Sequence, residues 1–314
     1  MDIFNTFEIA VIIPCFNEET TIGSVVDDFK QNLQDSNIYV YDNNSIDATN
    51  RVAKESGAIV RLETKQGKGN VVRRAFADID ADLYILVDGD GTYTAADAPQ
   101  MIQKLLSNHF DYINGVRVQK SNKAYRLGHK FGNTLLTGIV SFVFKSQIRD
   151  MLSGYKIFSR RFVKSFPAIS SGFEIETEIA VHALRLRLPM GEFLTNYQDR
   201  PDGSFSKLGT IKDGIKILFA IIKLIETERP ILFWTIIASV VGIISIIFGV
   251  PIIITYFDLG IVPRFPTAFF CGFLGIISIF SLFTGIILDL VQKSRDEVKR
   301  LFYLSIPFMR DRQK

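Results

Sequence analysis

Residues 83–92 read LYILVDGDGT, an apolar run that ends in two aspartates one position apart. A short continuous apolar run is typical of a strand that is buried on both faces of a sheet. In an extended chain Asp88 and Asp90 point to the same side, where their charges repel unless a positive group lies between them. Gly89 leaves room for a bulky substrate to approach the backbone. The pattern predicts either a metal site at a strand end or an acidic turn.

The chain before this run repeats the same kind of unit. We predict that Pro14 ends the first strand, with strands at 9–13, 38–41, 58–62 and 83–87 and helices at about 20–33, 47–56 and 71–77. This alternation predicts an α/β fold with a doubly wound sheet, which binds ligands at the carboxyl ends of its strands. Polar clusters follow three predicted strands, at 17–18, 42–44 and 88–90. Their oxygens suit Mg²⁺ or Mn²⁺, although spacing alone leaves the acidic turn open.

The last third of the chain is strongly apolar. Hydrophobic residues make up 47% of the 314 residues, and no charged residue occurs at 230–257 or 265–288. About 20 helical residues cross a ~30 Å hydrocarbon core, so we predict two transmembrane helices, with buried core helices as the alternative. Lys and Arg residues flank the outer ends, whereas the connection carries only Asp258 and Arg264. The positive-inside rule therefore predicts an integral membrane protein with both termini and the N-terminal domain in the cytoplasm.

Segments beside the spans are expected to lie at the membrane surface. Residues 211–225 place apolar side chains on one helical face and lysines on another, which is typical of an amphipathic interfacial helix. Residues 135–144 form either a second such helix or part of the soluble core. The net charge of +3 is small, and its basic residues beside the spans suit anionic lipid rather than nucleic acid. Cys15 and Cys271 lie in apolar segments, which fits a reducing compartment.

Seven short motifs occur in order between residues 9 and 207. They are IPCFNEE at 13–19, YDNNSIDAT at 41–49, GKG at 67–69, DGD at 88–90, GVR at 115–117, DMLSGYK at 150–156 and RPDGSFSK at 200–207. Together the motifs resemble glycosyltransferase family 2, and more narrowly the polyprenyl-phosphate glycosyltransferases similar to dolichol-phosphate mannose synthase. The resemblance implies a GT-A fold, in which a Rossmann-like doubly wound sheet forms the catalytic domain.

With the apolar segments, this resemblance divides the chain into four expected parts. They are a GT-A domain at 1–207, a juxtamembrane amphipathic helix at 208–229, two transmembrane helices with a short external hairpin at 230–290 and a basic cytoplasmic tail at 291–314.

Two motifs depart from the family pattern. Asn43 and Asn44 stand where the family often has Asp-Gly. Asn44 tolerates a positive φ, so the turn survives, and the missing carboxylate at 43 leaves base recognition to Asp42. Thr92 stands where many relatives have Gln, so the resemblance assigns no sugar or acceptor contact there.

The resemblance implies a nucleotide-sugar donor, a UDP-sugar in preference to a GDP-sugar. The residues that it assigns to the donor are Pro14, Phe16, Glu18, Asp42, Lys68, Asp88 and Gly89. Asp42 would hydrogen-bond the base, and Asp90, with Asp88, would bind the Mg²⁺ or Mn²⁺ that bridges the donor diphosphate. Lys68 would lie near the phosphates or the sugar, with a solvated loop lysine as the alternative.

The acceptor that the resemblance implies is a polyprenyl phosphate in the membrane, undecaprenyl phosphate if the host is bacterial. Arginine offers a planar donor fork that matches a phosphate group. The basic residues assigned to this phosphate are Arg117, Arg126, Arg200 and Lys207, each with a solvated surface position as the alternative.

The implied reaction is a single displacement that inverts the anomeric carbon and relies on electrostatic stabilisation of the departing diphosphate. Asp150 is either a base or a group that orients the arginines. Glu174 and Glu178 could pair across one helical turn, but starting and solvating a helix is the interpretation we favour for the acidic set. Glu176 stays a candidate for the acceptor site.

Other classes of protein fit the sequence less well. A processive polysaccharide synthase would carry a Gln-x-x-Arg-Trp motif, but the only tryptophan, Trp234, lies in the first apolar segment. A nucleotidyltransferase would not explain the arginines and spans. A different membrane acceptor, or a non-catalytic nucleotide-sugar-binding protein, stays open. We expect one sugar to be transferred to polyprenyl phosphate at the inner or plasma membrane for cell-envelope glycans, by a monomer or a homo-oligomer.

Overall fold

The computed structural model describes residues 7–119, 137–138, 140, 144, 148–172, 174–198, 222–223 and 225–309. The chain divides into two compact units, one of Met1–Asp213 with Lys299–Lys314 and one of Gly214–Val298. Most of the predicted interfacial segments at 135–144 and 211–225 lies outside the described residues.

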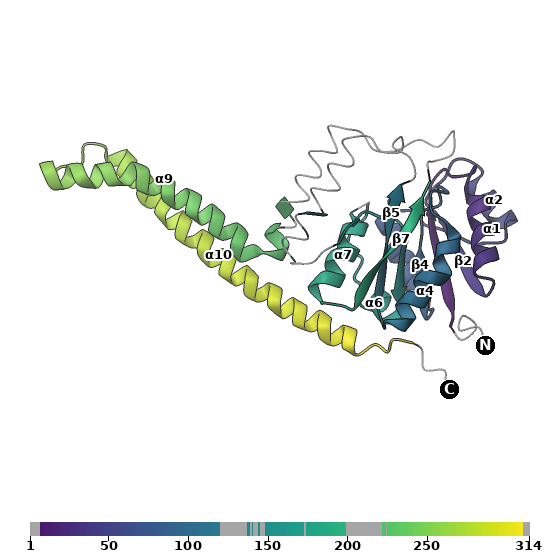
Figure 1. Cartoon of the computed structure of the whole chain (residues 1–314). Coiled ribbons are helices and arrows are strands. Elements are labelled where there is room, and N and C mark those ends of the chain that lie inside the picture. The colour runs from purple at the N-terminus through teal and green to yellow at the C-terminus, as the bar shows by residue number, and fades with distance from the viewer. Residues whose placement is uncertain are drawn as a thin grey trace. The chain divides into compact units, whose positions relative to one another are not determined.

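A mixed sheet forms the centre of the first unit (Figure 1). The strands in the described residues are β1 Ile9–Cys15, β2 Ser36–Asp42, β3 Ile59–Leu62, β4 Leu83–Leu86, β5 Tyr112–Gln119, β6 Lys156–Ser159 and β7 Met190–Tyr197. Their order is β3-β2-β1-β4-β6-β5-β7. The first four strands are parallel, as predicted, but β6 runs antiparallel to both β4 and β5. The doubly wound pattern therefore holds for the first half of the sheet, and an antiparallel insertion follows it.

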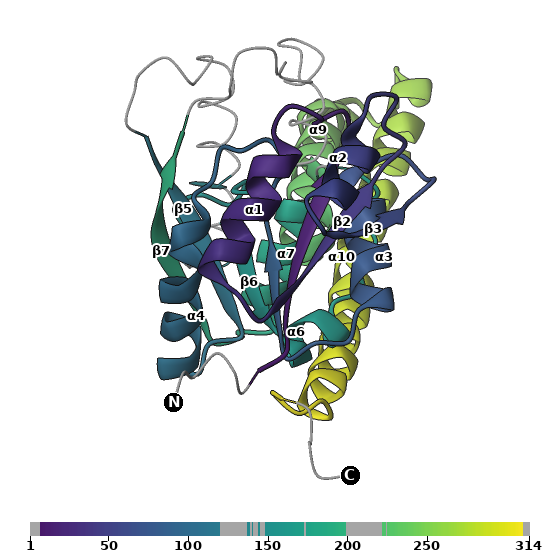
Figure 2. The same ribbon diagram turned by 90° about the vertical axis from the view of Figure 1, so that its right-hand side faces the viewer.

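Helices cover both faces of this sheet (Figure 2). They are α1 Ile22–Asn32, α2 Thr49–Glu55, α3 Lys68–Asp78, the short 3₁₀ helix η2 Ala95–Asp97, α4 Ala98–Ser107, α6 Arg160–Ser165 and α7 Ile175–Arg185. Alternate residues of β1 enter different cores: Val11 packs with α1 and α4, whereas Ile12 packs with α3, α6 and α7. This two-sided burial explains the continuous apolar run in the sequence.

The first strand extends beyond its predicted end. Pro14 was expected to stop the strand, but β1 continues to Cys15, and Pro14 pairs with Tyr41 of β2. Proline is tolerated here because pairing with β4 on the other side already ends at Ile12. The longer strand carries Cys15 to the edge of the site described below.

The second unit contains two long apolar helices, α9 Pro230–Leu259 and α10 Phe265–Leu304. The end of α10, from Lys299 on, belongs to the first unit. Both are long and apolar enough to cross a membrane, and most of their side chains are exposed within this chain. Helices buried in a protein core would not expose residues such as Phe248 and Phe257. We therefore describe α9 and α10 as candidate membrane spans.

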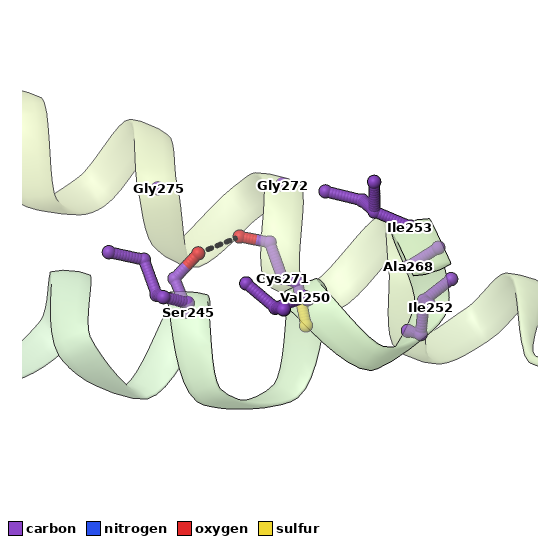
Figure 3. Close-up of a pocket in the computed structure, with 10 residues that line it drawn as sticks. Ser245, Val250, Ile252, Ile253, Ala268, Cys271, Gly272 and Gly275 are labelled. Carbon is purple, nitrogen blue, oxygen red and sulfur yellow. Dashed lines mark hydrogen bonds between the residues drawn. The ribbon is translucent and has the colours of Figure 1, made fainter. Parts of the chain in front are cut away.

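Small residues bring α9 and α10 into close contact. Ser278 donates a hydrogen bond of 2.7 Å to the Ala238 carbonyl, and a Cβ on Gly242 would lie 2.9 Å from the Ser278 hydroxyl. Further along, Ser245 donates to the Cys271 carbonyl at 2.8 Å, beside a groove of about 370 Å³ (Figure 3). Close packing through small residues and hydroxyl hydrogen bonds is typical of helix pairs in membranes.

A buried carboxylate ties the end of α10 into the first unit. Asp111 is fully buried and accepts two hydrogen bonds from Arg161, at 2.6 and 2.7 Å. It also accepts from Ser159 at 2.6 Å and from the Tyr303 hydroxyl at 2.5 Å. The Arg161 guanidinium lies over the Tyr303 ring at 5.0 Å. The last turn of α10 therefore forms part of the folded first unit.

Tyr303→Phe is expected to lower the free energy of unfolding of the first unit by about 1–2 kcal/mol, because it removes one hydrogen bond to a buried carboxylate. Asp111 would keep its bonds to Arg161 and Ser159, so the protein should still fold. Thermal unfolding of the purified protein in detergent measures the change. Tyr256→Phe, on the exposed surface of α9, is the matched control. Equal unfolding temperatures for Tyr303→Phe and the wild type would contradict the assignment.

Candidate functional site

The carboxyl ends of β1, β2 and β4 meet at one edge of the sheet. Cys15 pairs with Asp42, and the Asn43 amide donates to the Cys15 carbonyl at 2.8 Å. From the other side, the Thr21 hydroxyl donates to the Gly89 carbonyl at 2.7 Å. A Cβ on Gly89 would lie 2.6 Å from the Cys15 sulfur, so glycine is required here for packing. The three polar clusters of the sequence therefore come together as predicted.

Asp42 shapes the turn that follows β2. It is buried, accepts a hydrogen bond from the Ser45 amide at 2.9 Å and a second from the Asn50 side chain at 3.3 Å. Asn44 has a φ of 67°, the left-handed conformation that asparagine tolerates, as the sequence predicted. The turn thus holds Asp42 at the site edge, where its role toward a base stays a prediction.

Asn43 explains the departure from the family's acidic motif. Its side-chain amide donates to the Glu63 and Lys65 carbonyls, both at 2.8 Å. Its side-chain carbonyl accepts from the Gly67 amide at 2.6 Å. A carboxylate has no donor and could not make the first two bonds. Asn43 therefore fixes the loop between β3 and α3, which carries the Gly-Lys-Gly motif.

The Gly-Lys-Gly motif packs directly against the loop before α7. A Cβ on Gly67 would lie 2.2 Å from the Ser171 carbonyl oxygen, and one on Gly69 would lie 2.2 Å from that of Ser170. Gly67 also has a φ of 129°, which other residues rarely adopt. The two glycines therefore let α3 approach α7 closely enough for Lys68 to reach both Asp88 and Glu176.

Lys68 bridges two carboxylates in a buried position. Its ammonium lies 2.5 Å from Asp88 Oδ1 and 2.6 Å from Glu176 Oε1, and its side chain is only 7% exposed. Burial opposes its charge, but Asp88 and Glu176 outweigh that effect and raise the pKa of Lys68. Burial raises the pKa of Glu176, although Lys68 acts in the other direction. Lys68 thus offsets the charge of Asp88, one member of the acidic pair, and the solvated-lysine alternative is wrong.

The other acidic residues near Glu176 have structural roles. Glu178 accepts hydrogen bonds from the Ile169 and Ser170 amides, both at 2.8 Å, and Glu174 is the N-cap residue of α7. Glu176 instead faces Lys68, and its second oxygen has no hydrogen-bond partner among the described residues. Glu176 does lie in the first turn of α7, as predicted, but the prediction that it is solvated is wrong, because its side chain is buried.

Asp90 is held rigidly beside Asp88. It is buried, and its Oδ1 accepts from the Thr92 hydroxyl at 2.6 Å and from the Thr92 amide at 3.2 Å. Thr92 is therefore a support for Asp90. Both oxygens of Asp88 lie close to Gly154, where a Cβ would be 2.0 Å from Oδ2. This contact joins the Asp-Gly-Asp motif to the motif at 150–156.

The aspartate pair fits a cation that shares its ligands with a substrate. No group of three or more His, Cys, Asp or Glu side chains that could hold a metal by itself occurs in the part of the chain that the structure describes. Mg²⁺ usually takes one or two carboxylates and completes its shell with water and substrate phosphates. Asp88 and Asp90 supply that number of hard oxygen ligands at a fixed place.

Arg117 and Asp150 form a bidentate ion pair. The Arg117 Nε and Nη2 atoms donate to the two Asp150 oxygens at 2.7 and 2.8 Å, and the Arg117 amide donates to Oδ2 at 3.3 Å. The guanidinium also lies 5.4 Å from the centre of the Tyr197 ring. Since Arg117 occupies both Asp150 oxygens, the geometry favours Asp150 as an orienting group over Asp150 as a base.

Two buried polar residues next to this pair were given no role by the sequence analysis, in which Lys156 appears only as the last residue of the motif at 150–156. Asn114 donates to the Asp150 carbonyl at 2.8 Å, and Lys156 donates to the Asn114 side-chain oxygen at the same distance. Both are fully buried. A charged residue that opens a strand such as KIFS gives a weak signal, because it is read as the end of a loop.

The remaining predicted residues are only partly described. Pro14 lies within β1 one residue before its end, Phe16 and Glu18 follow that end, and all three are half-buried. Arg126, Arg200 and Lys207, which the resemblance assigns to the acceptor, lie outside the described residues. The described site therefore contains the donor-side aspartates and Lys68, and Arg117 with Asp150.

Comparison with known proteins gives the family. A family model described as glycosyl transferase family 2 matches residues 10–166. Glycosyltransferase AglJ of Haloferax volcanii is 33% identical over 229 residues, which cover 72% of this chain and 75% of that protein. A dolichyl-phosphate hexose transferase of the same organism is 24% identical over 222 residues, which cover 71% of this chain and 96% of that protein.

Solved structures confirm the GT-A fold. Glucosyl-3-phosphoglycerate synthase of Mycobacterium tuberculosis, in a complex with Mn²⁺, UDP-glucose and phosphoglyceric acid, matches with a TM-score of 0.54 and 21% identity. The match covers 71% of this chain and 80% of that chain. At this level of identity the likeness shows the fold.

Proposed function

Because the chain belongs to glycosyltransferase family 2, we propose that it moves one sugar from a UDP-sugar to a polyprenyl phosphate in the membrane. The observation that carries the proposal is that Asp88 lies against both Lys68 and Gly154, which joins the Asp-Gly-Asp motif to the motif that contains Asp150. The candidate spans of α9 and α10 support a lipid acceptor. So does the similarity to a dolichyl-phosphate hexose transferase.

The donor side of the site would hold the nucleotide diphosphate. Pro14, Phe16, Glu18 and Asp42 lie at the ends of β1 and β2, where we assign the nucleoside. Asp88 and Asp90 would hold Mg²⁺ or Mn²⁺, which neutralises charge on the leaving diphosphate when it is bound. Lys68 stays charged and keeps the Asp88 carboxylate in place.

The acceptor side would hold the lipid phosphate. An oxygen of this phosphate attacks the anomeric carbon, the bond from that carbon to the diphosphate oxygen breaks, and the nucleoside diphosphate leaves with the electron pair. The configuration inverts because attack and departure occur on opposite faces. A phosphate monoester is ionised near neutral pH, so no strong base is needed. Asp150 orients Arg117, and Arg126, Arg200 and Lys207 are proposed as further contacts of the phosphate.

The membrane arrangement completes the proposal. With both ends of the α9–α10 pair in the cytoplasm, the site would face the cytoplasmic leaflet. Nucleotide sugars are made in the cytoplasm, so the donor would be available on that side. In a bacterial host the lipid would be undecaprenyl phosphate, and the product would serve the assembly or modification of a cell-envelope glycan.

A donor panel tests this function. Purified protein in detergent, with Mg²⁺ or Mn²⁺ and a short-chain polyprenyl phosphate, is given radiolabelled UDP- and GDP-sugars one at a time. We expect label from one UDP-sugar in the organic phase, and loss of that label when the cation is chelated. Nucleotide release that is unchanged by added lipid, with no label in the organic phase from any donor, would exclude the polyprenyl acceptor.

A further inference from the structure

Lys156 is a fully buried lysine. It is connected to the Arg117–Asp150 pair through Asn114, which hydrogen-bonds both Lys156 and the Asp150 carbonyl. Its ammonium donates to three oxygens: the Asn114 side chain at 2.8 Å, the Tyr112 hydroxyl at 3.0 Å and the Met151 carbonyl at 3.2 Å. Tyr112 in turn donates its own proton to Asn114. An ammonium has three N–H donors and a neutral amine has two. The three acceptors therefore match the charged form of Lys156.

The partners of Lys156 lead directly to Asp150. Lys156 binds the carbonyl of Met151, and Asn114 binds the carbonyl of Asp150 while its own oxygen accepts from Lys156. The two consecutive backbone carbonyls of residues 150 and 151 are thus hydrogen-bonded by Asn114 and Lys156. The side-chain carboxylate of Asp150 in turn accepts two hydrogen bonds from the Arg117 guanidinium.

No carboxylate forms an ion pair with Lys156 among the residues that the structure describes. The charged groups that act on it from the surrounding elements are Glu176 of α7, Asp150 of the loop, Lys68 of α3 and Arg117 of β5. A buried cation with only neutral hydrogen-bond partners is costly, and an apolar side chain of the same length would fill the space without that cost. Because burying the Lys156 ammonium costs free energy, we expect its positive charge to have a function.

We propose that Lys156 is a positioning residue whose ammonium holds the 150–151 loop, so that Asp150 aims Arg117 at the acceptor phosphate. This inference rests on the proposed function, because it concerns the acceptor half of the same site. Burial lowers the pKa of Lys156 to about 7, below its ordinary value near 10.5. Below pH 7 the ammonium holds the loop, and as the pH rises through 7 one N–H is lost and the hold weakens.

The test compares full-length wild type, Lys156→Met and Lys156→Gln between pH 6 and 9, with kcat and the KM for polyprenyl phosphate measured at each pH. At pH 6, Lys156→Met, which removes all three hydrogen bonds of the ammonium, is expected to raise this KM by about 10-fold or more. At pH 9 the two proteins should differ less than at pH 6, because the neutral amine of the wild type keeps only two of its three N–H donors. The acceptor phosphate titrates equally for both proteins, so the ratio of KM values removes its contribution.

Two control variants identify the group that titrates. Lys104→Met removes another lysine that donates to a backbone carbonyl, that of Glu192. Its KM for polyprenyl phosphate should equal that of the wild type at each pH. Glu176→Gln removes a second group with a shifted pKa. Because the Glu176 charge raises the pKa of Lys156, the pH step of the KM should persist in this variant but move to lower pH. A KM ratio that is constant with pH, or a rise in the KM for the donor instead, would overturn the proposal.

A second measurement does not depend on activity. Hydrogen–deuterium exchange of the peptide at 148–155, compared at one pH, should be faster in Lys156→Met and Lys156→Gln than in the wild type or Lys104→Met. Unchanged exchange would contradict the holding role. Failure of the proposed function is distinct, since it would appear as wild-type protein that labels no lipid while this exchange difference persists.

Discussion

Asp90→Asn is expected to lower sugar transfer by on the order of 100- to 1000-fold, the usual loss when one preorganised electrostatic contact is removed from an active site. The amide keeps an oxygen that can accept from Thr92, so the local hydrogen bonds and the fold should survive. The lost negative charge removes one of the two carboxylates proposed to hold the cation. The variant therefore separates the chemistry of Asp90 from its structural role.

Transfer rates and Mn²⁺ binding in the presence of UDP, followed by electron paramagnetic resonance, measure this effect. Both should fall together in Asp90→Asn, while the unfolding temperature stays close to that of the wild type. Asp28→Asn, on the exposed face of α1, should change none of the three quantities. Weakened transfer with normal Mn²⁺ binding would show that Asp90 acts on the substrate rather than on a metal.

The first half of the fold follows from the sequence because the central strands β1 and β4 are buried on both faces. Val11 and Ile12 enter opposite cores, so the pattern is continuous and apolar, and only a parallel sheet between two helix layers accommodates it. The antiparallel direction of β6 could not be predicted in this way. Its four residues include the buried Lys156, and strand direction has no signature in so short a pattern.

The candidate site likewise contains residues that could be predicted from the sequence and one, Glu176, that could not. The strand-end residues Asp42, Asp88 and Asp90 could be predicted, because the ends of neighbouring parallel strands must meet at one edge. Glu176 could be identified only as one of three acidic residues with equal spacing. Its selection depends on the approach of α7 to α3 through Gly67 and Gly69, which is a contact between distant segments of the chain. Sequence spacing contains no record of such a contact.

Lys68→Met is expected to destabilise the first unit by about 3–5 kcal/mol, because it removes the only cation paired with both Asp88 and Glu176 among the described residues. Glu176 is the more deeply buried carboxylate, and its pKa is already raised by burial. Without Lys68 it should take up a proton at neutral pH and so offset part of the loss. Donor binding should weaken as well, because Asp88 loses the group that holds it.

The double variant Lys68→Met/Glu176→Gln tests this account, since it removes both members of the buried pair. We expect the double variant to unfold at a higher temperature than Lys68→Met alone, because no unpaired buried charge remains. Donor binding should not recover, because Asp88 still lacks its cation. Lys54→Met, on the exposed face of α2, is the matched control. If the second substitution lowered stability further, Glu176 would have to be stabilised by another group, and the bridge would not be the reason for its burial.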